Sequence, residues 1–193
     1  FKRYIIYLYL LIVLSPLKII NYLLQSKFYN VSSFDLVKKI FTEKIMINGL
    51  YFDTSDSDVF SRAKTLYSKE PDTINWINDY IRQDDVFYDI GANIGTYSLY
   101  AAKFYGAKVY SFEPESSNYY FLNKNIYYNN LFSRIKSYNV ALNDASLLSE
   151  LNSKFFRVSG NNQVNRKIDN RGKEFVPKFS QGIIALSLDD FIY

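Results

Sequence analysis

The strongest constraint on the fold is an alternation of short apolar runs with longer helical stretches between residues 86 and 142. The runs 86–90, 108–112 and 135–142 are bounded by turn residues, which is typical of buried parallel strands. The stretches 96–105 and 116–130 between them carry apolar residues at helical spacing. The order strand–helix–strand–helix–strand predicts an α/β fold with a parallel, Rossmann-like sheet, of which this segment is the first half.

The composition narrows the chemistry. None of the 193 residues is Cys or His. Disulfides, thiolate nucleophiles, His general bases and nearly all transition-metal sites are therefore excluded, and we predict no metal. Proton transfer would have to use Asp, Glu, Lys, Tyr or water.

The net charge of the chain is +4, and the excess of basic residues lies within residues 1–44. This distribution favours an anionic membrane surface over nucleic acid, for which a basic patch on the fold itself would be expected. Residues 4–24 are mostly apolar but are interrupted near Pro16 and Lys18. A spanning helix needs about 20 apolar residues, so a membrane anchor and a packed or interfacial helix kinked at Pro16 both stay open.

The remaining segments predict the following organisation. Residues 1–30 form an apolar helical segment, a candidate membrane anchor. Residues 31–71 form a lead-in with a helix around 34–41 and a hairpin that turns at Asn48-Gly49. Residues 72–193 form the main domain, which begins with a helix capped by Asp72. Its last part contains strands at 147–151 and 175–186, and then a capping box from Ser187 to Asp190.

A glycine-bearing turn follows the first parallel strand: Asp89-Ile90-Gly91-Ala92-Asn93-Ile94-Gly95. Gly91 permits a tight turn and close approach of a ligand, and Asn93 tolerates the left-handed conformation. Gly95 lets the next helix pack closely, and the start of that helix presents unpaired N–H groups. We expect Asp89, Gly91, Ala92, Asn93 and Gly95 to bind a ligand here.

Two further strand ends complete this candidate site. Glu113 ends the second strand about 20 residues after the first glycine, where an acidic side chain can accept hydrogen bonds from ribose hydroxyls. Pro114 follows and stops the strand. At the end of the third predicted strand lie Ala141, Asn143 and Asp144, which we expect to cover an adenine ring.

The sequence of the turn discriminates between two adenosine ligands, NAD and S-adenosyl-L-methionine. A dinucleotide site requires G-x-G-x-x-G, and this chain has D-x-G-x-N-x-G. A carboxylate at Asp89 suits a ligand with a cationic end, which favours S-adenosyl-L-methionine over NAD. Glu70 is a further candidate, either for the amino group of this ligand or as a helix cap.

Several motifs follow one another along the chain: Asp85–Ser98 with the glycine turn, Phe112-Glu113-Pro114, residues 122–125, Ala141–Asp144 and Ser187–Phe191, with Glu70-Pro71 ahead of them. Together they resemble the FkbM-type S-adenosylmethionine-dependent methyltransferases over roughly residues 66–193. The resemblance implies a class I methyltransferase fold that methylates a hydroxyl group, often on a sugar or a polyketide. The family continues with a Lys-Ile-Asp-x-Glu-Gly type strand that this sequence lacks, so we expect an N-terminal fragment of a methyltransferase.

The expected partners are a small-molecule or glycan acceptor and a membrane surface at residues 4–24, with no nucleic acid. The expected location is the cytoplasm, including the inner face of the membrane. No catalytic residue is identified, and the sequence does not define an oligomeric state. Two alternatives stay open: an NAD(P)-dependent oxidoreductase on a Rossmann fold, and a non-catalytic membrane-tethered fragment.

Overall fold

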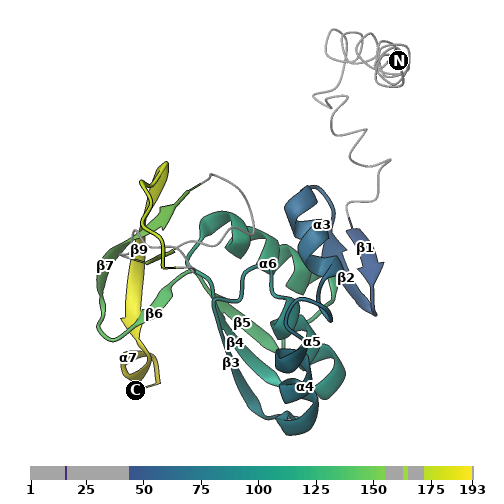
Figure 1. Ribbon diagram of the computed structural model, residues 1–193. Helices are drawn as coiled ribbons and strands as arrows, with labels where there is room; N and C mark the ends of the chain where they lie inside the picture. The colour runs from purple at the N-terminus through teal and green to yellow at the C-terminus, as the bar shows by residue number, and fades with distance from the viewer. Residues whose placement is uncertain (1–15, 17–43, 155–162, 165–171, 193) are drawn as a thin grey trace, which may run out of the picture. The chain divides into compact units, whose positions relative to one another are not determined.

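The computed structural model describes Pro16 and residues 44–154, 163–164 and 172–192 (Figure 1). Apart from Pro16, these residues belong to one compact unit that spans 44–193. The predicted apolar segment 4–24 and the predicted helix 34–41 lie outside the described residues. Among the residues that are described, no helix is both long and apolar enough to cross a membrane.

The centre of this unit is a three-stranded parallel sheet in the order β3-β4-β5. Its strands are β3 (Val86–Ile90), β4 (Lys108–Phe112) and β5 (Ile135–Tyr138). Helix α5 (Thr96–Tyr105) connects the first two strands, and α6 (Ser116–Tyr128) connects the second and third. The predicted α/β fold with a parallel, Rossmann-like sheet is therefore confirmed.

The two faces of this sheet have different side chains. Phe87, Val109 and Ile135 pack into the main core, which also contains Leu99 of α5 and Leu122 of α6. The other face carries stacked aromatic rings, with neighbouring centroids 5.5–6.5 Å apart, from Tyr88, Tyr110, Phe112 and Tyr138. Strand alternation explains this division, because successive side chains point to opposite faces.

A short C-terminal helix, α7 (Leu188–Ile192), contacts the aromatic face. The ring of Phe191 lies edge-on at 4.9 Å from Phe112 and 5.0 Å from Tyr138, measured between centroids. The capping box that the sequence predicts at its start is half correct. The amide of Asp190 donates to Ser187 Oγ at 3.1 Å, but the Asp190 carboxylate accepts from Ser146 and does not bond the Ser187 amide.

A second sheet has the order β6-β9-β7-β8 and combines parallel and antiparallel pairs. Its strands are β6 (Ala141–Asn143), β7 (Leu147–Ser153), β8 (Gln163–Val164) and β9 (Phe179–Ser187). The predicted strands 147–151 and 175–186 correspond to β7 and β9, which pair antiparallel, although β9 begins only at Phe179. The predicted third strand 135–142 is wrong in its extent, because β5 ends at Tyr138 and β6 pairs with β9 in this other sheet.

The lead-in to the sheet consists of a hairpin and two helices. Strands β1 (Lys44–Ile47) and β2 (Leu50–Asp53) are joined by the predicted turn, where Asn48 and Gly49 have φ of 51° and 80°. Helix α3 (Ser57–Lys64), which the sequence reading did not identify, follows the hairpin.

Helix α4 (Pro71–Tyr80) precedes the first parallel strand, but its predicted cap is wrong. Glu70, not Asp72, occupies the N-cap position, and its side chain makes no capping hydrogen bond. Pro71 sets the start of the helix, because its fixed φ suits the first helical turn and it has no N–H to satisfy. Asp72 lies one residue inside, where its negative charge still favours the helix dipole.

Gly95 provides a direct test of this packing. A Cβ on Gly95 would lie 2.4 Å from Leu122 Cδ1, a fully buried side chain, and its φ is 86°. We expect Gly95→Ala to lower the free energy of unfolding by about 2 kcal/mol, through strain and overpacking. Chemical denaturation measures the change.

Gly182→Ala is the matched control. A Cβ there meets no atom within 4 Å, and its backbone is not left-handed. We expect this variant to retain wild-type stability or gain slightly. Equal losses in the two variants would show that α5 and α6 do not pack at Gly95 as described.

Candidate functional site

The glycine turn lies at the carboxyl end of β3 and adopts the predicted conformation. Gly91, Asn93 and Gly95 all have positive φ, at 77°, 53° and 86°. The amides of Gly91 and Ala92 donate to the carbonyl of Phe112 at 2.9 and 3.0 Å, which ties the turn to the end of β4. A Cβ on Gly91 would meet no atom within 4 Å, so open space lies beside this backbone.

Glu113 joins the turn to the second strand end. Its Oε2 accepts from the Asn93 amide at 2.7 Å, and its Oε1 accepts from the Glu115 amide at 2.9 Å. The side chain is buried, and burial raises its pKa against the opposing effect of these backbone hydrogen bonds. Each carboxylate oxygen can accept more than one hydrogen bond, so Glu113 keeps acceptor capacity for a hydroxyl group.

Asp89 is buried beneath the turn and bonds to the following helix. Its Oδ2 accepts from both the amide and the hydroxyl of Ser98, and this hydroxyl lies 2.7 Å from Ser111 Oγ. Burial raises the pKa of Asp89, although the bonds to Ser98 oppose the shift. The carboxylate therefore connects β3 to the first turn of α5, a role that the sequence reading did not foresee. Its predicted contact with a ligand stays a prediction.

Glu70 reaches the same region from the N-cap of α4. The hydroxyl of Tyr97, in the first turn of α5, donates to Glu70 Oε2 at 3.0 Å. Burial and this bond raise the pKa of Tyr97. The positive charge of Arg62 in α3 opposes this rise in pKa at Tyr97 and also at Asp89. Charges of both signs therefore act on this end of the turn.

Asn139, not Asn143 or Asp144, follows the third parallel strand. Its side-chain amide donates to the carbonyls of Glu113 and Pro114, at 2.8 and 3.1 Å. Asn143 and Asp144 are exposed at the end of β6, in the second sheet, where Ala141 is buried. Asn139 is not among the predicted site residues, because the predicted third strand 135–142 runs through this position.

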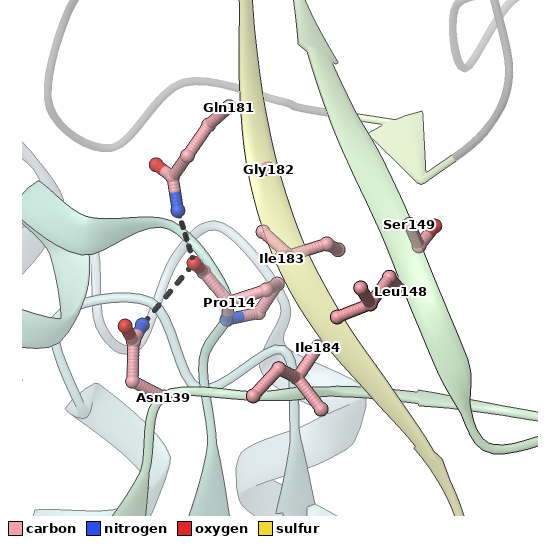
Figure 2. A pocket seen from close by; sticks show the side chains of 8 residues that line it. All are labelled: Pro114, Asn139, Leu148, Ser149, Gln181, Gly182, Ile183 and Ile184. Atoms are coloured by element: carbon pink, nitrogen blue, oxygen red, sulfur yellow. Dashed lines mark hydrogen bonds between the residues drawn. The ribbon is translucent and has the colours of Figure 1, made fainter.

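A groove of about 370 Å³ lies beside Pro114, between the end of the parallel sheet and strands β7 and β9. Figure 2 shows the amides of Asn139 and Gln181 converging on the Pro114 carbonyl, the latter at 2.9 Å. The remaining lining is mostly apolar and comes from Leu148, Ser149, Gly182, Ile183 and Ile184. A groove with apolar walls and a few amides suits a flat heteroaromatic ring.

The site thus brings together Asp89, Gly91, Ala92, Asn93, Gly95, Glu113, Pro114 and Glu70. It contains hydrogen-bond acceptors, a helix N-terminus and a groove, which together can hold an adenosine-like ligand. In the part of the chain that the structure describes, no cluster of acidic residues could hold a metal ion.

Comparison with known proteins gives partial structural matches only. No protein-family model matches the sequence, and no curated protein matches it. A putative transferase from Pyrococcus horikoshii is 23% identical, with a TM-score of 0.38, over 51% of this chain and 36% of that one. P. horikoshii TYW2 in complex with MeSAdo is 25% identical, with a TM-score of 0.40, over 51% and 35%.

An RNA methyltransferase from Salinibacter ruber in complex with S-adenosyl-L-homocysteine is 19% identical, with a TM-score of 0.36, over 38% of this chain and 49% of that one. The chain thus spans about a third to a half of the length of these proteins. Because each match is partial, it assigns neither an activity nor a ligand to this chain.

The burial of Asp89 predicts a pH dependence. A carboxyl group whose pKa is raised by folding binds protons more tightly in the folded state, so its contribution to stability falls as pH rises above its ordinary pKa near 3.8. The amide in Asp89→Asn does not titrate. We therefore expect the free energy of unfolding of Asp89→Asn, relative to that of the wild type, to rise between pH 4 and pH 7. A constant difference, or a change in the opposite direction, would contradict a raised pKa for this carboxyl group.

Proposed function

We propose that this chain is part of an S-adenosyl-L-methionine-dependent methyltransferase of the FkbM type. The observation that carries the proposal is the 2.7 Å hydrogen bond between the Asn93 amide and the Glu113 carboxylate. It brings the ligand-facing turn of β3 and the acidic end of β4 to one edge of a parallel sheet. Doubly wound sheets bind adenosine ligands at this edge.

The residues of the site fit the three parts of this cofactor. Asp89 and the turn from Gly91 to Gly95 would hold the methionine part, where open space beside Gly91 allows close approach. Glu113 would accept hydrogen bonds from the ribose hydroxyls. The groove beside Pro114 would take the adenine ring, with Asn139 at its edge. The predicted residues Ala141, Asn143 and Asp144 do not line this groove, so their contact with the adenine ring stays a prediction.

The charges at the methionine end also suit a zwitterion. Glu70 would bind the amino group, and Arg62 would attract the carboxylate. The positive charge of Arg62 favours the ionised forms of Asp89 and Tyr97. The buried negative charge of Asp89 would favour the positive sulfonium over a pyrophosphate.

When bound, the cofactor supplies an electrophilic methyl group on a sulfonium. The protein would accelerate its transfer chiefly by holding an acceptor hydroxyl in line with that methyl group, at about 3 Å. The proposed acceptor is a sugar, a polyketide or a similar small molecule or glycan. No general base is assigned among the described residues. Cytoplasmic location and membrane contact through residues 4–24 remain part of the proposal.

An NAD(P)-dependent oxidoreductase is the second candidate, because the same edge of the sheet binds dinucleotides in Rossmann folds. The sequence disfavours this candidate at one position. The dinucleotide motif G-x-G-x-x-G would have its second glycine at position 93, where this chain has Asn93, with φ of 53°. A non-catalytic membrane-tethered fragment is the third candidate. It would bind neither ligand.

Isothermal titration with S-adenosylhomocysteine tests the proposal. We expect the wild-type chain to bind, and Glu113→Gln to bind about tenfold more weakly, because a charge-assisted acceptor is lost. Glu115→Gln is the matched control. Glu115 is also a buried carboxylate, but it caps α6 by accepting from the amides of Ser117 and Asn118. We expect its affinity to stay within about twofold of the wild type.

Titration with NADH separates the alternatives. Binding of NADH without binding of S-adenosylhomocysteine would favour the oxidoreductase. Binding of neither ligand by a folded chain would favour the non-catalytic fragment. Equal losses in Glu113→Gln and Glu115→Gln would contradict a direct role for Glu113.

A further inference from the structure

Two buried asparagines, Asn125 in α6 and Asn129 at its C-cap, lie one turn apart. Residues spaced by four lie on the same face of a helix. Both face the backbone of β2, to which they are distant in sequence. The hairpin is therefore docked on α6 through specific polar contacts as well as through its apolar side chains.

The two side-chain amides pair with β2 much as a neighbouring strand would. Asn129 Oδ1 accepts from the Tyr51 amide at 2.9 Å, and Asn129 Nδ2 donates to the Tyr51 carbonyl at 2.7 Å. Two residues further along β2, Asn125 Oδ1 accepts from the Asp53 amide at 2.8 Å. Residues two apart on a strand present their amides to the same side, so the spacing of the asparagines matches the strand.

Asn125 also reaches the glycine turn. Its Nδ2 donates to the carbonyl of Ile94 at 2.9 Å, and both residues are fully buried. Ile94 lies between Asn93 and Gly95, both of which have positive φ. The Asp53 amide requires an acceptor, which fixes the orientation of the Asn125 side chain and leaves its NH₂ group for Ile94.

The neighbouring ion pair holds the hairpin in this register. Lys124 Nζ lies 2.6 Å from Asp53 Oδ2, and the Asp53 side chain is fully buried. Burial opposes ionisation of Asp53, but the contacts with Lys124 and Ser55 outweigh it and lower its pKa. Asp53 is therefore ionised and paired at neutral pH, directly beside the backbone amide that orients Asn125.

We propose that Asn125 is a positioning residue for the glycine turn. By bonding the Ile94 carbonyl, it holds the turn in the conformation that binds the cofactor. Without this donor, the carbonyl would be buried without a partner in a backbone that is already strained at Asn93. The turn would then open more often to find water. The part of the inference that concerns ligand affinity rests on the proposed function, whereas the part that concerns the order of the turn does not.

The test compares Asn125→Asp with Asn129→Asp in the full chain. Each variant keeps the acceptor for a β2 amide and loses the NH₂ donor. Only Asn125 bonds the turn; Asn129 Nδ2 bonds the carbonyls of Tyr51 and Asn125. The first readout is hydrogen exchange of the amides of residues 93–96 without ligand, with the Val109 amide in β4 as the reference for global opening.

We expect Asn125→Asp to speed exchange in the turn about tenfold relative to Val109, and Asn129→Asp to change it less than about twofold. The second readout is affinity for S-adenosylhomocysteine, which should fall about tenfold in Asn125→Asp only. Asn125→Ser, which removes the amide without adding a charge, should show the same pattern if Asn125→Asp does not fold.

The outcomes separate the two proposals. Equal turn exchange in the two Asp variants would overturn the positioning role, whatever the wild type binds. Faster exchange in Asn125→Asp together with no binding of S-adenosylhomocysteine by the wild type would support the positioning role and count against the proposed function.

Discussion

The hydrogen bond from the Asn93 amide to the Glu113 carboxylate is the contact on which the site depends. Asn93 follows β3 and Glu113 follows β4, and the hydrogen bond holds their amide nitrogen and carboxylate oxygen 2.7 Å apart. The same side chain accepts from the Glu115 amide, just before α6 begins. One buried carboxylate therefore determines the relative positions of the turn, the second strand end and the next helix. The backbone amides that donate to this carboxylate offset part of the cost of burying it.

Helix α6 supports this arrangement from behind. Asn118 lies 3.4 Å from Glu113 Oε1, Leu122 packs where Gly95 has no side chain, and Asn125 bonds the Ile94 carbonyl. These positions follow one face of the helix at spacings of three and four residues. Helix α6 connects two parallel strands, and it also contacts both Glu113 and the glycine turn.

Much of this could be predicted from the sequence because the signals are local. The strands 86–90 and 108–112 have the predicted bounds, since apolar runs between turn residues leave little choice. The positive φ of Asn93 also follows from its place between two glycines. The break after Tyr138 could not be predicted, because the pairing of β6 with β9 depends on residues far along the chain. The bond from Asn125 to Ile94 is likewise non-local, and an asparagine within a helix gives no sign of it.

The most direct test of the central claim is an NMR titration of the ¹⁵N-labelled chain with S-adenosylhomocysteine. A ligand at the carboxyl edge of the sheet should shift the amides of Gly91–Gly95, Glu113, Glu115 and Asn139, and leave the amino ends of the strands, such as Val86 and Lys108, unchanged. Shifts confined to other parts of the chain, or no shifts at saturating ligand in a folded sample, would contradict an adenosyl site at these strand ends.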